Sequence, residues 1–180
     1  MGALMKYINR ISRCSSLFKN GKLEHKGLNG YQHVYIRNIC REPGISQDNL
    51  AKSIYVNKSS VTRQLALLEQ NGFITRRPSD KDRRVMQVYP TQKALNILPE
   101  IKRLSAEWES AITTDLTDKE RSLFLSILER IMEKAAEKVD QEVYKEEDAG
   151  AEEDDAANVY VKAVEVVKGE AKADMKEGDK

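Results

Sequence analysis

The stretch that decides the fold is NKSSVTRQLALLEQN, residues 57–71. Its apolar residues Val61, Leu65 and Leu68 recur at intervals of four and three, which places them on one face of a helix. The asparagine at its start can cap the first turn, and the Asn-Gly pair at its end is typical of a helix terminus. The other face carries small polar and basic residues, as does a helix that enters a major groove. Taken alone, the pattern fits an ordinary surface helix equally well.

A shorter helix is predicted just before this stretch, over residues 45–54. Ser46 is a good N-cap, and Asp48 near the start suits the positive end of the helix dipole. The turn to the next helix is short and contains Tyr55 and Val56 where glycine is often found. Two helices joined in this way form a helix-turn-helix.

Two extended stretches follow, residues 73–77 and 85–90, joined by a polar, charged turn. This arrangement predicts a β-hairpin, and a hairpin directly after a helix-turn-helix is a wing. An arginine at its tip would enter the minor groove, where the negative potential is strongest. The alternative is a hairpin with ordinary solubilising charges. The basic residues in question are Arg76, Arg77, Lys81, Arg83 and Arg84.

Helical spacing recurs on both sides of this core. One helix is expected to run from about Leu4 to Asn20, and further helices over about residues 31–41, 91–112 and 117–139. Thr91 is expected to cap the helix at about 91–112, and Pro99 to kink or break that helix. These stripes offer more apolar surface than the small winged core can cover. At roughly 25 cal/mol per Å² of buried apolar area, pairing them within and between chains is favoured, so we expect an obligate homodimer.

The charge is unevenly distributed. Residues 144–180 contain six Lys and twelve Asp or Glu, whereas residues 1–143 contain 24 basic and 17 acidic residues. A basic body with an acidic tail is one pattern that points toward nucleic acid. We therefore expect a first domain at 1–143, with a DNA-binding core at about 28–91. We expect an acidic, largely disordered tail at 144–180.

Several function classes are disfavoured. No apolar run approaches the roughly 18 residues that a membrane span needs, and the N-terminus has no signal-peptide pattern, so we expect a cytoplasmic protein without a membrane partner. His25 and His33 match no metal-ligand spacing. We find no paired carboxylates, nucleophile–base set or phosphate loop, and therefore expect neither an enzyme nor a cofactor.

The central part of the chain resembles the MarR family of bacterial regulators. The resemblance rests on Ile45-Ser46-Gln47, Leu50-Ala51, the run from Asn57 to Arg63, the run from Leu68 to Ile74, Arg76-Arg77 and the run from Asp80 to Arg84. With the helix order it covers about residues 4–143. The family usually has Leu-Thr and a nearby Gly after its second wing strand, where this chain has Tyr89-Pro90-Thr91 and Ala94. The acidic tail is also outside the family pattern.

The resemblance implies a mainly helical winged helix-turn-helix protein with a small β-hairpin wing and N- and C-terminal dimerisation helices. It implies a homodimer that binds a pseudo-palindromic operator on double-stranded DNA, usually as a repressor. Family members often release DNA when a small-molecule effector binds between the dimer helices and the winged domain, and others use an oxidised cysteine. Both alternatives stay open here, and Cys14 is the candidate for the second.

We assign roles at DNA on this basis. Ser46 and Gln47 would bind phosphate, Lys58 and Arg63 would lead the contacts in the major groove, and Arg84, oriented by Asp82, would probe the minor groove. The alternative is a winged-helix module that binds another protein without reading a DNA sequence. The full set of expected DNA-binding residues is Ser46, Gln47, Asn57, Lys58, Ser59, Ser60, Thr62, Arg63, Arg76, Arg77, Lys81, Asp82, Arg83 and Arg84.

Overall fold

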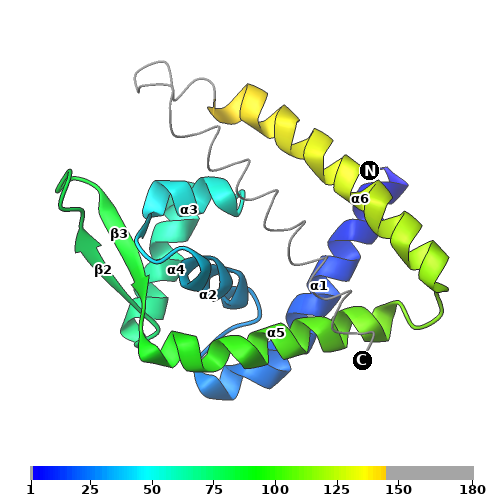
Figure 1. Cartoon of the computed structure of the whole chain (residues 1–180), viewed down its shortest axis with the longest axis horizontal. Helices are drawn as coiled ribbons and strands as arrows, with labels where there is room; N and C mark the ends of the chain where they lie inside the picture. The colour runs from blue at the N-terminus through cyan, green and yellow to red at the C-terminus, as the bar shows by residue number, and fades with distance from the viewer. Residues whose placement is uncertain (1, 145–180) are drawn as a thin grey trace. The chain divides into compact units, whose positions relative to one another are not determined.

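The computed structural model describes residues 2–144, and the acidic tail expected at the C-terminus lies almost entirely outside them. The chain divides into two compact units between Ile112 and Thr113. The first unit holds α1 to α5 and a three-stranded sheet; the second holds α6 (Asp118–Val139) and a π-helical turn, Asp140–Tyr144 (Figure 1). Among the described helices, none is both long and apolar enough to cross a membrane.

The elements of the first unit follow the predicted order, apart from a 3₁₀ turn and a first strand that were not predicted. They are α1 (Ala3–Leu23), a 3₁₀ turn (Glu24–Lys26), α2 (Gln32–Arg41), β1 (Ile45–Ser46), α3 (Gln47–Ser53), α4 (Lys58–Gln70), β2 (Ile74–Pro78), β3 (Met86–Pro90) and α5 (Gln92–Ile112). The sheet is antiparallel in the order β1-β3-β2. The predicted winged helix-turn-helix is therefore confirmed. We name β2, β3 and their connecting loop (residues 79–85) the wing.

One strand was not predicted. Ile45 was expected to begin a helix, but Ile45 and Ser46 form β1 and pair with Val88 and Gln87 of β3. Ile45 is buried, with 3% of its surface exposed, and an extended backbone carries it into the core while Ser46 caps the helix that follows. Strand β1 thus connects the start of the helix-turn-helix to β3 of the wing.

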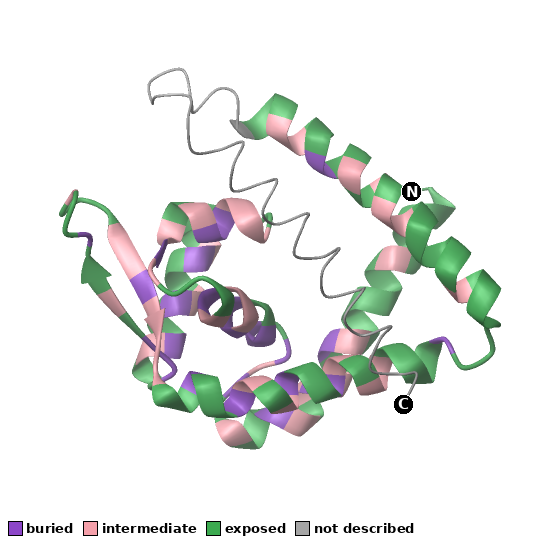
Figure 2. Ribbon diagram, viewed as in Figure 1, coloured by how far each residue is buried: buried purple, intermediate pink, exposed green. Residues whose placement is uncertain are grey.

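The core of this unit gathers around α4. Its residues Val61, Leu65 and Leu68 are all fully buried, as their spacing predicts, and Figure 2 shows the buried positions on the inner faces of the helices. Phe73, just after α4, is fully buried as well. The other members of the core cluster come from the remaining α-helices and the three strands of the unit, and one, Leu28, from a loop: Leu23, Leu28, Tyr35, Ile36, Ile39, Ile45, Leu50, Ala51, Ile74, Val88, Ala94, Ile97, Ile101 and Leu104.

Helix α1 is longer than its sequence indicates. Asn20 and Gly21 were expected to end it, but it continues to Leu23, which is fully buried. Burying this side chain outweighs the cost of a glycine inside a helix, roughly 1 kcal/mol relative to alanine.

Further along, a Cβ on Gly30 would lie 2.1 Å from the carbonyl oxygen of Ser16, so only glycine permits this close approach to α1.

The C-terminal half of α1 packs on α5. The rings of Phe18 and Trp108 lie 5.4 Å apart between centroids. Lys22 Nζ lies 2.7 Å from Glu107 Oε1, and in the adjoining 3₁₀ turn Lys26 pairs with Glu100. The predicted contact between the N-terminal helix and a distant segment is thus present within one chain.

Helix α5 differs from its expected pattern in two ways. Pro99 was expected to kink or break it, and the helix is continuous through this residue, so there is no break. In its first half the buried residues are Ala94 and Ile97. Leu95 forms an apolar repeat with Leu98 and Ile101 at spacings of three, which predicts an inner position, but it is 43% exposed. The hydroxyl of Thr91, expected to cap the helix, lies 2.7 Å from the carbonyl oxygen of Gly72 and so connects α5 to the end of α4.

In the second unit, α6 begins where the sequence predicts. Thr117 and Glu120 form a capping box: the Thr117 N–H donates to Glu120 Oε2 at 2.9 Å, and the Glu120 N–H donates to the Thr117 hydroxyl. This arrangement satisfies N–H groups that the first turn of a helix leaves free.

A buried polar pair joins α1 to α2. Lys19 and His33 are 7% and 9% exposed, and Lys19 Nζ lies 3.1 Å from His33 Nε2. His33 Nδ1 lies 2.7 Å from the carbonyl oxygen of Gly30, so the neutral ring donates there and accepts from the lysine. Burial, and secondly the charge of Lys19, lower the pKa of His33 from 6.5 to about 4.

This pair predicts a pH dependence of stability. Because the unfolded chain takes up the His33 proton at a higher pH than the folded chain does, the free energy of unfolding falls as the pH drops from about 6.5 to about 4. We expect His33→Gln to remove that part of the decline in urea unfolding, since glutamine can still accept from Lys19. The exposed His25 provides the control His25→Gln, which should keep the decline; equal slopes in both variants would contradict the assignment.

Candidate nucleic-acid interface

The helix-turn-helix consists of α3, a tight turn and α4. Tyr55 lies in the turn with φ +52°, a left-handed backbone conformation that residues other than glycine rarely adopt. The turn is held by backbone hydrogen bonds from Tyr55 N–H to the Lys52 carbonyl and from Val56 N–H to the Ala51 carbonyl. Ile54 and Val56, on either side of Tyr55, are half-buried and pack against the core, and this packing holds the strained position.

Both helices have the N-caps that the sequence predicts. The Ser46 hydroxyl accepts from the Asn49 N–H at 3.1 Å, and Asn57 Oδ1 accepts from the Ser60 N–H at 2.8 Å. These bonds fix where α3 and α4 begin. They also engage the Ser46 hydroxyl oxygen and Asn57 Oδ1, two acceptors on residues that were expected to contact DNA.

The outward side of α4 presents the residues that were expected to face the major groove. Its exposed members, which we name the reading face, are Lys58, Ser59, Thr62 and Arg63, while Ser60 is half-buried beside them. Lys58 Nζ lies 4.0 Å from Asp48 Oδ1 of α3, a weak contact between exposed groups. The Thr62 hydroxyl donates to the Lys58 carbonyl at 2.9 Å and keeps its oxygen available as an acceptor.

The loop of the wing holds Arg84 in the predicted ion pair. Arg84 Nη2 lies 3.0 Å from Asp82 Oδ2 and Arg84 Nε 3.1 Å from Asp82 Oδ1, which also accepts from the Arg84 N–H at 3.0 Å. These hydrogen bonds hold the pKa of the Asp82 carboxyl below its usual value. The Arg84 side chain is nevertheless 92% exposed, so its direction is fixed while it remains accessible.

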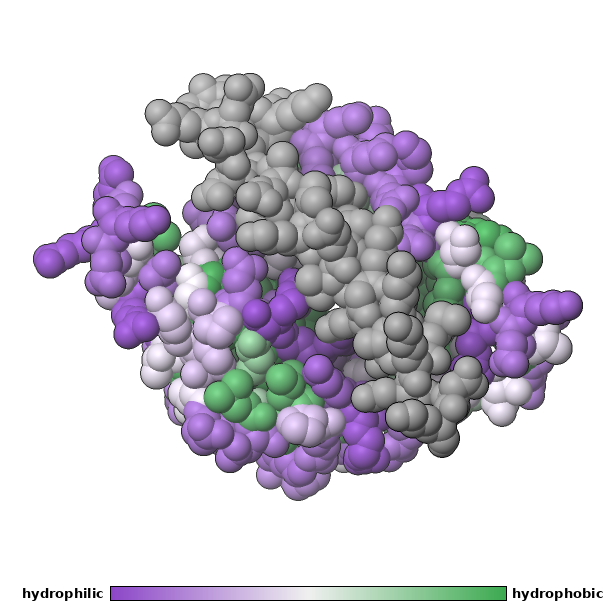
Figure 3. All heavy atoms as spheres, viewed as in Figure 1, coloured by the Kyte–Doolittle hydropathy of each residue, from purple (hydrophilic) through white to green (hydrophobic). Residues whose placement is uncertain are grey.

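The other basic residues of the wing differ in their surroundings. Lys81 and Arg83 are exposed on the loop, and the guanidinium of Arg77 lies 3.8 Å above the ring of Tyr89. Figure 3 shows the tip of the wing as a hydrophilic projection. Stacking on the aromatic ring keeps the charge of Arg77 while it restricts the side chain.

Arg76 does not join the exposed set. Its guanidinium makes two hydrogen bonds to Glu69 Oε2, at 3.0 Å from Nε and 2.6 Å from Nη2, and its backbone N–H donates to Glu69 Oε1 at 3.0 Å. The side chain is only 22% exposed. The expectation of a free DNA-facing arginine at this position overlooked Glu69, seven residues earlier, because the pairing depends on how the turn after α4 directs β2.

Gln47 is also less available than expected. Its Oε1 is buried and, within residues 2–144, has no hydrogen-bond partner. The residue is half-buried at the start of α3. The sequence indicated its place at a helix start but gave no indication of the inward orientation of its side chain.

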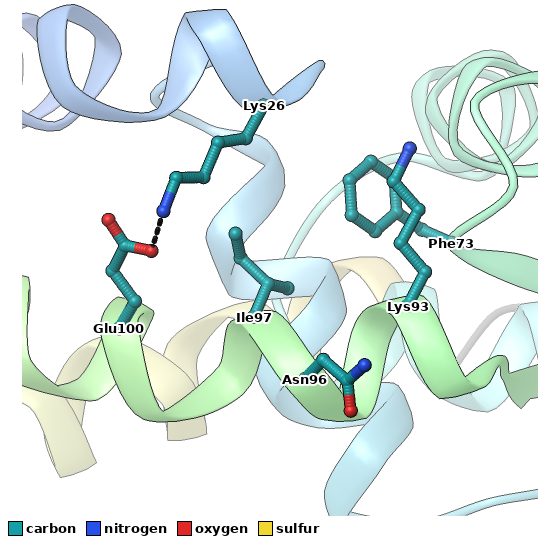
Figure 4. A pocket seen from close by; sticks show the side chains of 6 residues that line it. All are labelled: Lys26, Phe73, Lys93, Asn96, Ile97 and Glu100. Carbon is teal, nitrogen blue, oxygen red and sulfur yellow. Dashed lines mark hydrogen bonds and ion pairs between the residues drawn. The ribbon is translucent and has the colours of Figure 1, made fainter.

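A hollow of about 500 Å³ lies between the 3₁₀ turn and the start of α5 (Figure 4). Its cations are already engaged: Lys93 donates to the Asn71 carbonyl at 2.8 Å and lies over the ring of Phe73, and Lys26 pairs with Glu100. We therefore assign it no ligand. The described residues also contain no group of three His, Cys, Asp or Glu that could hold a metal ion.

Comparisons with known proteins agree on one family. A model of the MarR family matches residues 28–86. The uncharacterized HTH-type transcriptional regulator YybA of Bacillus subtilis is 25% identical over 131 residues, which cover 73% of this chain and 87% of that protein.

Solved structures give the same result. A crystal structure of MarR is 33% identical with a TM-score of 0.69, and the alignment covers 76% of this chain and 99% of that one. A mutant MarR from E. coli in complex with operator DNA is 22% identical with a TM-score of 0.65, covering 71% and 92% of the two chains. At that identity the second likeness shows the fold alone.

The cap of α4 gives a prediction that is independent of DNA. Asn57→Ala should lower the free energy of unfolding by about 1 kcal/mol, the usual cost of losing an N-cap. Asn57→Asp should retain stability to within a few tenths of a kcal/mol because aspartate caps equally well. Urea unfolding measures both variants, and equal losses in the two would show that the cap bond contributes nothing.

Proposed function

Because the chain belongs to the MarR family of winged helix-turn-helix transcriptional regulators, we propose that it binds a specific pseudo-palindromic operator as a homodimer and acts as a signal-responsive repressor. The observation that carries the proposal is the pairing of two accessible cationic elements in one unit. These elements are the reading face of α4 and the exposed, oriented Arg84 of the wing.

The reading face is proposed to enter the major groove. Lys58 and Arg63 would contact guanine edges or phosphates, and Ser59, Ser60 and Thr62 would lie close to the bases. Asn57 would stand at the groove edge, where its cap bond sets the start of the helix. Ser46 and Gln47 would lie against a phosphate at the flank of the site.

The wing is proposed to reach the adjacent minor groove with Arg84, whose direction Asp82 fixes. Negative potential is strongest in a narrow minor groove, so a single arginine there contributes both affinity and sequence preference. Lys81, Arg83 and Arg77 would add sequence-independent attraction that weakens with salt.

The homodimer is proposed from apolar surface that each unit leaves exposed. On α1, Leu4 and Leu17 are 49% and 73% exposed, and on α6, Leu123 and Phe124 are 62% and 44% exposed. Figure 3 shows hydrophobic side chains gathered on the N-terminal half of α6. Apolar surface of this kind on long helices favours pairing with a second copy. Two recognition helices would then stand about 34 Å apart, one turn of DNA.

Two signals are proposed. A small-molecule effector is one, by likeness to the family's regulation. Oxidation of Cys14 is the other, and this thiol is exposed on α1. Cys40 fits the second proposal less well because burial raises the pKa of its thiol and so disfavours the reactive thiolate.

The test is selection of DNA fragments from a genomic library by the full chain at two salt concentrations, with sequencing of the bound DNA. Enrichment of a two-fold-symmetric site supports the dimeric regulator. Binding without an enriched motif contradicts sequence-specific readout. Absence of binding at low salt favours the alternative, a winged-helix module that binds another protein.

For the wing, we expect Arg84→Ala to weaken binding to the enriched duplex by about 1–3 kcal/mol, the range for one specific contact. The matched control is Arg103→Ala, which removes an exposed arginine from α5 that pairs with Glu107. Fluorescence anisotropy titration measures both. If the two variants bind equally well, Arg84 has no role at DNA.

For the dimer, we expect sedimentation equilibrium to give about twice the chain mass of 20.5 kDa. Phe124→Glu should shift the equilibrium toward monomer, because it would bury an unpaired charge in the proposed interface. The control is Lys134→Glu, at an exposed position on the same helix, which changes the net charge more than Phe124→Glu does. A wild-type chain that sediments as a monomer would rule the homodimer out.

A further inference from the structure

One ion pair connects the recognition helix to the wing. Glu69 lies in the last turn of α4 and Arg76 in the middle of β2, and three hydrogen bonds of 2.6 to 3.0 Å join them. One of the three comes from the backbone of β2, so the carboxylate holds the strand itself as well as its side chain. The hydrogen bonds from Arg76 lower the pKa of Glu69, which therefore stays ionised.

The pair spans a short hinge. Only Asn71, Gly72 and Phe73 separate α4 from β2, and Gly72 has φ +75°, a conformation that glycine adopts without strain. At the base of this hinge the Thr91 hydroxyl contacts the carbonyl oxygens of Gly72 and Phe73. The ion pair between Glu69 and Arg76 joins the two elements on either side of this hinge.

The wing continues well beyond this ion pair. Past Arg76 the strands pair at Arg77–Gln87 and Pro78–Met86, and then the loop carries Arg84. Two strand residues alone add about 7 Å. A small rotation at the hinge is therefore amplified at Arg84, whose own ion pair with Asp82 fixes it only relative to the loop.

We propose that Glu69 and Arg76 are positioning residues, which set the angle between α4 and the wing so that the reading face and Arg84 bind adjacent grooves together. The inference rests on the proposed DNA binding and adds residues that need not touch DNA. Simultaneous binding matters because a wing free to rotate must lose that freedom on the DNA, which reduces what Arg84 contributes.

The competing role for Arg76 is the one that its charge suggests, a contact to phosphate. The two roles predict opposite signs for Glu69→Gln. If Arg76 acts through phosphate, removing a nearby negative charge and weakening its grip on Arg76 should strengthen all DNA binding. If the pair positions the wing, Glu69→Gln should weaken binding to the selected duplex although it removes a negative charge.

The first experiment titrates the full chain, as wild type and Glu69→Gln, with the duplex enriched by the wild type and with a scrambled duplex of equal length. We expect affinity for the enriched duplex to fall on the order of three- to tenfold, within the range for a disrupted network. Affinity for the scrambled duplex should stay equal or rise. A rise on both duplexes overturns the proposal.

The second experiment is a double-mutant cycle with Arg84→Ala. If the ion pair positions Arg84, the loss caused by Arg84→Ala should be smaller in the Glu69→Gln background than in wild type by about threefold or more, because the contact is already impaired. Equal losses in the two backgrounds overturn the proposal. The control is Glu137→Gln, which removes the carboxylate of an exposed ion pair within α6 and should leave the Arg84 loss unchanged.

Arg76→Lys gives a third, independent variant. Lysine keeps the charge, so a phosphate contact would largely survive, but it cannot make the forked contact to Glu69. We expect Arg76→Lys to behave like Glu69→Gln, and wild-type affinity in this variant overturns the proposal. Thermal unfolding of each variant distinguishes lost positioning from lost fold. A wild-type chain that enriches no site refutes the proposed function itself, whereas enrichment with an additive cycle refutes only the positioning role.

Discussion

The apolar face of α4 can be buried only if the opposite face of the same helix points outward. Val61, Leu65 and Leu68 are fully buried, so the rotation of α4 about its axis is fixed by the core. Because the core fixes this rotation, the reading face points outward without needing contacts of its own to hold it there. Stability and recognition thus depend on opposite faces of one helix, and the rest of the unit holds α4 in place. The turn after α3 sets the start of α4, and β1, directly before α3, links the helix-turn-helix to the wing.

The amino-acid sequence predicts these features where a local rule decides them. Caps at Ser46 and Asn57 and the buried stripe of α4 depend on residues close together in the sequence, and all are present. The bond between Asp82 and Arg84 is local as well. The errors arise where distant residues decide. Burial of Leu23 extends α1 past a glycine, and pairing with Val88 turns Ile45 into a strand.

The same distinction holds for the arginines of the candidate interface. Arg76 and Arg77 are neighbours with the same charge, but successive side chains of a strand point to opposite sides. One meets Glu69 and the other stacks on Tyr89. Composition alone gives both an equal role at DNA. The three-dimensional structure divides them, because the carboxylate and the ring are brought to β2 by other elements.

Helix α5 contacts the connection between α4 and β2 at one end and α1 at the other. Its start is tied to the hinge of the wing through Thr91 and Lys93, and its far end packs on α1 through Trp108. At 21 residues it is about 32 Å long, so a tilt of about 5° at one end displaces the other by about 3 Å. Pro99 supplies no N–H to the backbone hydrogen bonds of α5, so we expect the helix to bend most easily around this residue. Stiffness along α5 is therefore a property that substitutions at position 99 would alter without touching either end.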